Sequence, residues 1–380
     1  MASEYAKHWT LEEGLLFLNH GSFGACPRVV LEAQSELRAR MERNPLKFIS
    51  RDQEALLDGA RAALGGFVHA DAEDLVFVPN ATTGVNTVIR SLELQAGDEL
   101  LTTDHAYNAC RNALRWHEPR GVRVVAARVP WPIEGPHQVI DAVMGALTPR
   151  TKLVLLDHIT SPTGLVFPVQ ALVAKLRERG VDALVDGAHA PGQIPLDLEA
   201  IGAAYYTGNC HKWLCTPKGS GFLHVRRDRH ANVKPLAIGH GLNSARTDRS
   251  RFRLDMDFSG TDDATPFLCI PAALRFLGGL LEGGWPELMR RNHALALQAR
   301  EVLCRALRVP KPAPDFMLGS LASVPLPDGD RPALQRELFD RHRIEVPIMP
   351  FPPGKRLVRV SAQLYNSLDE YAALARLLQV

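Results

Sequence analysis

The sequence predicts an α/β protein, with a mostly parallel central sheet in a large domain and a smaller α+β domain at the C-terminus. Short apolar strand-like runs alternate with helix-like segments from Leu75 to about Val225, which is typical of a parallel sheet covered by helices. After a loop-rich stretch, two long helices precede a mixture of strands and helices. We therefore expect three parts: an N-terminal arm that joins the small domain (1–26), a large domain (27–260), and a helical connection with the small domain (261–380).

The individual elements follow from the spacing of apolar residues. Helices are expected at 28–43, from 52 to about 64, toward residue 92, and at 109–117, 139–147, 168–179, 271–281, 287–307 and 334–341, with a last helix at the C-terminus. Strands are expected at 75–78, 99–103, 122–129, 152–157, 183–186, 219–225, 318–324 and 357–361. The glycine-containing stretch 18–24 is expected to be a turn or loop, and the link 44–48 to be non-helical.

Composition excludes several classes of protein. The chain has 380 residues, 46% of them hydrophobic, and a formal net charge of +2, so no general attraction to nucleic acid or membrane is expected. No apolar run approaches the ~18–20 residues of a membrane span. The six cysteines are scattered without a C-x-x-C pair, which favours a reducing, cytoplasmic location. Cys210, His211 and Cys215 lack the paired spacing of a zinc site, so no metal is expected.

One lysine stands out. Lys212 follows the aromatic and β-branched stretch Tyr205–Thr207 and precedes Trp213 and Leu214. Burial disfavours the charged form of an amine, lowers its pKa, and lets it attack a carbonyl to form a Schiff base. Most lysines, however, are solvated surface residues, and composition alone does not decide between these two interpretations.

Polar residues follow the predicted strands, where ligands bind in α/β sheets. Asp186 is either a turn-forming residue or a carboxylate that pairs with a protonated ring nitrogen. His189 either packs against the same ring or is a core residue. The segment Asn80–Gly84 begins a helix, so it is a capping motif, a phosphate site, or both. The segments Asp104–Tyr107 and Ser161–Gly164 end at the same edge.

Together these pieces resemble a known family. The pattern Thr207-x-Asn209-x-His211-Lys212, preceded by Asp186–His189 and Ala81–Gly84, resembles the class V aminotransferases, which are pyridoxal 5′-phosphate (PLP) enzymes of fold type I. The resemblance extends from about Leu18 to Tyr365. The segments Asn19–Gly24 and Arg359–Asn366 are most similar to the isopenicillin N epimerase-like branch, which also contains C–S lyases that act on cysteine sulfoxide conjugates.

The resemblance implies roles for individual residues. It implies a catalytic set of Lys212, Asp186, His189 and Tyr107. It implies a cofactor-binding set of Thr82, Thr83, His105, Ser161, Asp186, His189, Thr207, Asn209, His211, Lys212 and Thr261. It implies substrate contacts from Asn19, His20, Gly21 and Arg359. Either His105 or Tyr107 would stack on the cofactor ring, and Arg356 is a rival to Arg359 for the substrate carboxylate. Thr261 would reach the phosphate of a partner subunit, which implies a homodimer with a shared active site.

The implied activity is that of an enzyme acting at the α-carbon of an amino acid or amino-acid conjugate, by epimerisation through a quinonoid. The alternative is a β-eliminating C–S lyase acting on a cysteine or cysteine sulfoxide conjugate. His20, Tyr107 and Cys215 are candidates for the second acid that epimerisation needs opposite Lys212. A transaminase, a non-catalytic PLP-fold protein and a cysteine desulfurase are less favoured, the last because Cys304 lies inside a predicted helix.

Overall fold

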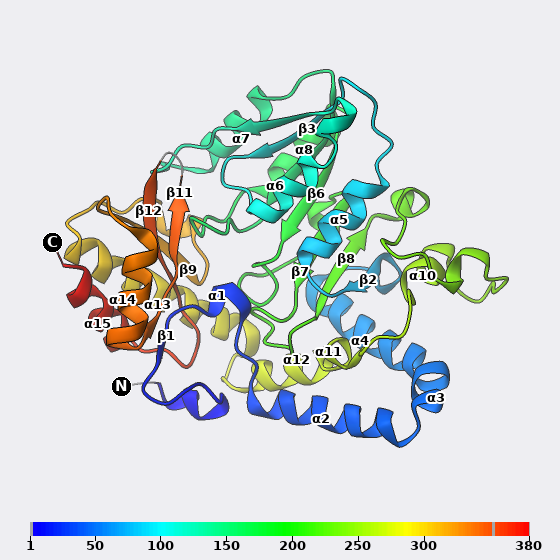
Figure 1. Ribbon diagram of the computed structural model, residues 1–380, viewed down its shortest axis with the longest axis horizontal. Helices are drawn as coiled ribbons and strands as arrows, with labels where there is room; N and C mark the ends of the chain where they lie inside the picture. The colour runs from blue at the N-terminus through cyan, green and yellow to red at the C-terminus, as the bar shows by residue number, and fades with distance from the viewer. Residues whose placement is uncertain (1–2, 352–353, 380) are drawn as a thin grey trace.

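A seven-stranded sheet forms the centre of the computed structural model, which describes residues 3–351 and 354–379 (Figure 1). Its strand order is β2-β8-β7-β6-β5-β3-β4, and in the described chain β8 alone runs antiparallel to its neighbours. The strands are β2 (Leu75–Val78), β3 (Glu99–Thr103), β4 (Arg123–Ala127), β5 (Thr151–Asp157), β6 (Asp182–Gly187), β7 (Tyr205–Asn209) and β8 (Gly221–Val225).

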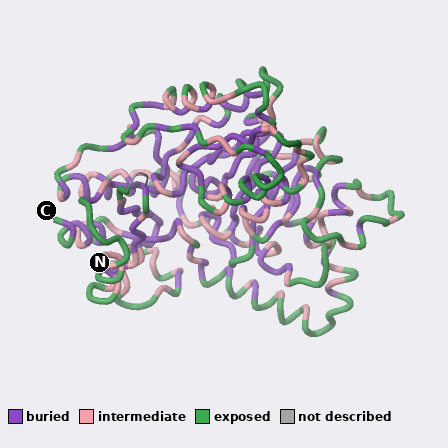
Figure 2. The backbone as a smooth tube through the Cα atoms, turned by 45° about the horizontal axis from the view of Figure 1, so that its top comes forward, coloured by how far each residue is buried: buried purple, intermediate pink, exposed green. Residues whose placement is uncertain are grey.

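Helices cover both faces of this sheet, because alternate residues along each strand point to opposite sides. One face packs against α5 (Ala81–Ser91), α6 (Asn108–Arg115) and α10 (Arg251–Met256). The other packs against α4 (Gln53–Val68), α7 (Pro136–Gly145) and α8 (Val169–Glu178). The sheet is therefore buried on both sides, as Figure 2 shows by the purple centre of the chain. The short helix α9 (Leu198–Ile201) packs beside α8, and the short helix α11 (Thr265–Leu268) packs against α4.

The C-terminal part builds a smaller α+β unit. Its antiparallel sheet has the order β11-β12-β9, from β9 (Leu321–Leu326), β11 (Ile348–Phe351) and β12 (Lys355–Ser361). Its helices are α12 (Ile270–Gly279), α13 (Gly284–Ala306), α14 (Arg331–His342) and α15 (Leu368–Leu378). The N-terminal segment joins this unit, since β1 (Leu16–Phe17) pairs in parallel with β10 (Ile344–Glu345).

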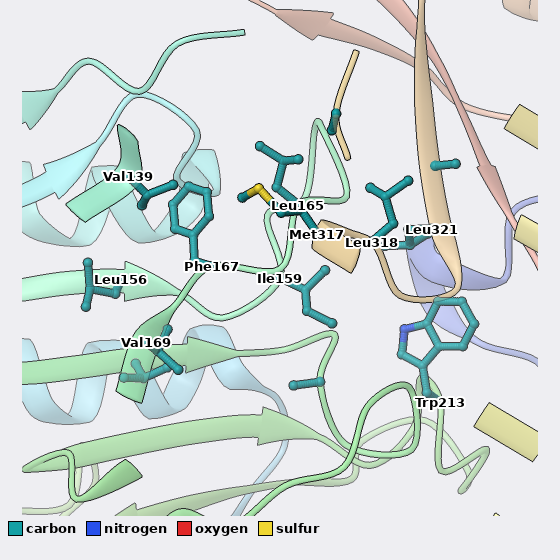
Figure 3. Close-up of a cluster of buried hydrophobic side chains, with 14 of the residues drawn as sticks. Val139, Leu156, Ile159, Leu165, Phe167, Val169, Trp213, Met317, Leu318 and Leu321 are labelled. Carbon is teal, nitrogen blue, oxygen red and sulfur yellow. The ribbon is translucent and has the colours of Figure 1, made fainter. Parts of the chain in front are cut away.

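One apolar core crosses from the large unit into the small one. Leu165 and Phe167, which follow β5, belong to the same buried cluster as Met317, Leu318 and Leu321 (Figure 3). Trp213 is fully buried in this cluster as well, and Figure 3 draws it beside the β9 region. The residue next to Lys212 is thus held by the core that joins the two units.

The α/β expectation is confirmed, two local expectations are wrong, and a third stretch contains a short helix that was not expected. Residues 18–24 contain a short helix, α1 (His20–Phe23), because the Ser22 hydroxyl donates to Asn19 Oδ1 and Gly24, at φ 70°, closes the turn. The link 44–48 is helical: Asn44 caps α3 (Pro45–Lys47), and a π-helical turn follows before α4. The loop-rich stretch 239–260 contains α10, capped by Ser250. The remaining long helix, α2 (Arg28–Arg43), begins and ends where expected.

Within residues 3–351 and 354–379, no single helix is long and apolar enough to cross a membrane. By length and composition alone, one pair of helices, Thr265–Gly279 and Gly284–Ala306, bent by 72°, passes that test.

Candidate active site

A cavity of about 680 Å³ opens at the carboxyl ends of the parallel strands. Its size suits a cofactor together with a small substrate. Loops that follow β2, β3, β5, β6 and β7 supply most of its wall, and α1, β11 and β12 close it from the small unit. Of the residues named from the sequence, the lining contains Gly21, Thr82, Thr83, Tyr107, Ser161, Asp186, His189, Asn209, His211, Lys212 and Arg359.

Lys212 lies in the turn after β7, with its amine directed into the cavity. Its Nζ is 3.2 Å from Nε2 of His189. Burial, and then the positive charge of Arg359, lower the pKa of Lys212 to about 7. A large fraction of this amine is therefore neutral, and nucleophilic, at neutral pH. The His20 ring holds the backbone of Lys212 in place, because the Lys212 carbonyl accepts a hydrogen bond of 3.0 Å from it.

Asp186 and His189 come from the end of β6 and the turn that follows it. The Asp186 carboxylate accepts hydrogen bonds from the Cys110 thiol (3.1 Å) and the Ala188 N–H (3.0 Å). Burial raises the pKa of Asp186. Burial, and then the Lys212 charge, hold the pKa of His189 well below its usual value, so its imidazole is neutral. Nδ1 of His189 is buried and has no hydrogen-bond partner among the described residues.

The N-terminus of α5 forms another part of the wall. Asn80 caps the helix by accepting from the Thr83 N–H at 2.9 Å, and Asn209 accepts from the Ala81 N–H at 2.8 Å. Asn209 thereby ties the end of β7 to the start of α5. Thr82 and Thr83 line the cavity at this positive end of the helix dipole, which favours an anionic group.

His211 lines the cavity beside Lys212, and its ring is held by a 2.8 Å hydrogen bond from Nδ1 to the Ser220 carbonyl. Burial lowers the pKa of His211 to about 4, so this side chain is neutral at neutral pH.

Arg359, in β12, is buried at the cavity wall. Its guanidinium donates to the Ser161 carbonyl at 2.6 Å and to the Ser22 hydroxyl at 3.0 Å. Burial lowers the pKa of Arg359 to about 10, so it keeps its charge at neutral pH. No carboxylate of the described residues lies within ion-pair distance of it, and its Nε has no hydrogen-bond partner there. A substrate carboxylate is the natural partner for such a cation.

The structure separates the two candidates for stacking on the cofactor ring. Tyr107 lines the cavity and is 46% exposed. The ring of His105 is fully buried and both its nitrogens are occupied, Nδ1 by the Thr163 hydroxyl at 2.8 Å and Nε2 by the Val129 carbonyl at 3.1 Å. His105 therefore holds two loops together and does not reach the cavity.

Four further residues named from the sequence also lie outside the lining. Thr207 donates its hydroxyl to the Phe222 carbonyl at 2.8 Å, behind the start of α5. His20 holds the Lys212 carbonyl and the Tyr365 hydroxyl, the latter at 2.8 Å. Asn19 accepts from Ser22 at 2.5 Å and so acts on Arg359 indirectly. Thr261 is exposed.

Sequence reasoning missed several cavity residues, chiefly Asp157, Ser22, Phe23 and Met349. Asp157 carried a signal that could have been used, because it is a second acid at the end of an apolar strand, as Asp186 is. Met349 carried none, since an apolar residue in the C-terminal part is indistinguishable from core.

The chemistry of the cavity fits PLP. An available lysine amine, an acid placed for a ring nitrogen, and a helix N-terminus for a phosphate are the groups that this cofactor requires. The orphaned Nδ1 of His189 and the unshared charge of Arg359 are buried groups that a bound cofactor and substrate would satisfy. Lys212 would hold the aldehyde, Asp186 the ring nitrogen, and Thr82 and Thr83 the phosphate. Fold and site together define a PLP-dependent enzyme of fold type I.

Comparison with known proteins gives the family. A family model described as aminotransferase class-V matches residues 17–370, and the chain belongs to this family. An isopenicillin N epimerase of Amycolatopsis lactamdurans is 38% identical, over 97% of this chain and 96% of the relative. A probable chloroplastic L-cysteine desulfhydrase of Arabidopsis thaliana is 29% identical, over 98% and 83%. A solved cystine C–S lyase in complex with cysteine persulfide has a TM-score of 0.80 at 23% identity, over 96% and 97%. The expected family, fold type and PLP dependence are confirmed.

Proposed function

We propose that the protein inverts the configuration at the α-carbon of an amino acid or amino-acid conjugate, as an isopenicillin N epimerase-like enzyme. The observation that carries this proposal is the placement of two proton-carrying groups. Lys212 follows β7 and Tyr107 follows β3, and the strands β6 and β5 lie between them. The two side chains therefore enter the cavity from opposite sides of Asp186. The similarity to epimerases at 38% identity supports the same choice.

The residues of this chain divide the work of such a reaction. Bound PLP supplies an electron sink that weakens a bond at the substrate's α-carbon. Arg359 binds the substrate carboxylate and fixes which bond is presented. Lys212, with its pKa lowered to about 7, takes or returns a proton on its side. Tyr107 returns or takes the proton on the other side. His20 and Cys215 do not compete for this task, because neither lines the cavity.

A second candidate function is β-elimination from a cysteine conjugate. The similarity to L-cysteine desulfhydrases favours it, and elimination requires only the Lys212 side of the site. Cysteine desulfurase chemistry has less support, since Cys304 is buried in α13 and absent from the cavity lining. Phe23, Ile159 and Met349 add apolar side chains to the lining, which suits a substrate with an apolar part in either reaction.

A panel of amino acids and short peptides in deuterated water separates the two functions. Epimerisation gives inversion with α-deuterium in the product and no keto acid. Elimination gives keto acid, ammonia and a released sulfur compound. Borohydride should trap the cofactor on Lys212 in either case, and a PLP-saturated protein without that adduct would refute both functions.

The variant Tyr107→Phe sharpens the comparison. Removal of one acid–base group typically costs about 10²-fold or more in rate. We expect inversion to fall by that amount, while α-deuterium exchange without inversion continues through Lys212. If exchange and inversion fall in the same proportion, Tyr107 is not the second acid. Trp116→Phe, an exposed aromatic substitution beyond α6, is the control and should change neither rate.

We also propose that the active form is a homodimer located in the cytoplasm. Exposed Thr261 and the large apolar side chains of Phe23, Ile238 and Leu242 support a partner surface, and the six free cysteines are consistent with a reducing compartment. Light scattering after gel filtration measures the mass. If Thr261 acts across the interface, mixing inactive Lys212→Ala with weakened Thr261→Ala subunits should restore activity in hybrid dimers. A monomeric active species would contradict the dimer.

A further inference from the structure

Two buried carboxyl groups lie side by side beneath the cavity. Asp157 is the last residue of β5, and its register partner on β6 is Asp186. Neighbouring strands lie about 5 Å apart, and partners in register project to the same face. Asp157 is 3% exposed and Asp186 is 4% exposed, and both line the cavity. Asp186 is the acid that would hold the cofactor's ring nitrogen, whereas Asp157 has no role in the proposed reaction.

The surroundings of the two carboxyls differ. Asp186 receives the Cys110 thiol and the Ala188 N–H, and it faces the Lys212 amine. Asp157 interacts with the backbone N–H groups of Tyr107 and of Asp157 itself, and with the positive charge of Arg111 in α6. A negative charge is therefore better compensated on Asp186, which lies nearer to the reactive lysine.

Electrostatics favours one proton for the pair. Two carboxylates in one dry site cannot both ionise easily, because each charge raises the proton affinity of the other. Burial, and then the charge of Asp186, hold the pKa of Asp157 well above its usual value. Burial also raises the pKa of Asp186, but the Cys110 and Ala188 hydrogen bonds and the Lys212 charge oppose that rise.

We propose that Asp157 is a positioning residue that carries the proton of the Asp157–Asp186 pair, so that Asp186 alone presents a negative charge to the cofactor's ring nitrogen. The neutral carboxyl keeps an oxygen that faces the Tyr107 N–H. The assignment of the proton rests on the adjacent positions and the burial of Asp157 and Asp186. Only its purpose rests on the proposed role of Asp186 at the cofactor.

Infrared spectroscopy of the PLP-free protein tests the proton directly. A protonated carboxyl has a carbonyl-stretch band separate from carboxylate bands, and it shifts in deuterated water. At pH 7 we expect this band in the wild-type protein and its loss in Asp157→Asn. In Asp186→Asn the band should disappear at a lower pH than in the wild type, because the charge that raises the proton affinity of Asp157 has been removed.

Thermal unfolding provides an independent readout with a defined sign. A carboxyl whose folded pKa is raised contributes stability below its unfolded pKa and loses it as pH rises toward the folded pKa. The Tm of wild type relative to Asp157→Asn should therefore be highest in acid and fall as the pH rises above about 4. For each unit by which the folded pKa of Asp157 exceeds its unfolded pKa, the unfolding constant of wild type relative to Asp157→Asn should change by about tenfold over that pH range. Asp141→Asn, at an exposed site in α7, serves as the matched control and should leave the pH profile unchanged.

The outcomes are distinct. A wild-type protein without a protonated-carboxyl band at pH 7, or with a Tm that parallels that of Asp157→Asn at every pH, overturns the proposal. If Asp157→Asn does not fold, the wild-type band and its displacement in Asp186→Asn still decide. Both measurements use the PLP-free protein, so a failure of the proposed epimerase function would leave their result intact.

Discussion

At the scale of single residues, the reactivity of the site depends on the amine of Lys212. Its pKa is lowered to about 7 by burial and by Arg359, whereas a solvated lysine would stay protonated to about pH 10. We expect the rate at which PLP-free protein captures PLP to rise with pH and level off above about 7. Stopped-flow absorbance across pH 5–10 measures this midpoint. In Arg359→Gln the midpoint should move to higher pH, and an unchanged midpoint would show that Arg359 does not act on the lysine.

The role proposed for Arg359 in binding the substrate carboxylate carries a cost in stability. A hydrogen bond to a charged group contributes about 1.5–3 kcal/mol, so Arg359→Met should raise KM roughly 10- to 100-fold. The same change removes a buried charge that has no carboxylate partner among the described residues, so the PLP-free protein should gain thermal stability.

The rival arginine serves as the control for this prediction. The half-buried Arg356 donates to the Pro327 carbonyl at 2.5 Å and the Asp330 carbonyl at 3.0 Å, outside the cavity. Arg356→Met should leave KM unchanged. Steady-state kinetics and thermal unfolding measure both variants, and a larger KM effect at Arg356 would reverse the assignment.

The sequence shows which side chains are polar, but it does not show which of them are already hydrogen-bonded to a neighbouring residue. This limited how much of the site could be predicted. Lys212 and Asp186 stood out as charged residues in an apolar setting, which need a partner. Their roles, and the choice of Arg359, came from the order of the family's motifs. Thr207 and His105 look equally polar in the sequence. Only the structure shows that a neighbouring carbonyl or hydroxyl already satisfies them. Asp157 was overlooked because it was counted as the end of a strand.

At the scale of elements, the cap of α5 links helix stability to cofactor binding. Asn80→Ala removes the bond to the Thr83 N–H and should cost about 1 kcal/mol in unfolding free energy. It should also weaken PLP binding, since Thr83 lines the cavity. Asn44 caps α3 in the same way, by accepting from the Lys47 N–H at 3.0 Å, and it lies far from the cavity. Asn44→Ala is therefore the control. Denaturant titration and PLP titration should show a stability loss in both variants and an affinity loss only in Asn80→Ala.

Most strands and long helices were predictable because each has a strong period and a buried face. The strand 99–103 and the helix 28–43 have the predicted bounds. The elements that were missed include α1, α3 and α10, which are short and lack a complete apolar period. The strands β1, β7, β10 and β11 were not among the expected strands either. Side-chain caps define α3 and α10, from Asn44 and Ser250, and a single turn closed by Gly24 defines α1.

At the scale of the whole molecule, the shared core makes the two units one folding unit. Leu321 of β9 is fully buried in the cluster that also holds Phe167 and Trp213. Calorimetry should therefore show one unfolding transition. Leu321→Ala should lower it as a whole, at a cost of about 2–5 kcal/mol, whereas exposed Leu377→Ala should have little effect. Two transitions, of which only one moves, would show that the units unfold separately.

The bonds of Arg359 span the chain, since Ser161 lies 198 residues before it and Ser22 lies 337 residues before it. This separation has a consequence during protein synthesis. A nascent chain that has emerged as far as β8 already contains the lysine, the acid of β6 and the helix N-terminus that PLP would use. Arg359, the residue proposed to bind the substrate carboxylate, is synthesised much later than these groups. The groups that would hold PLP are therefore synthesised before the arginine that would bind an amino acid. A nascent chain could capture the cofactor before it is able to bind a free amino acid.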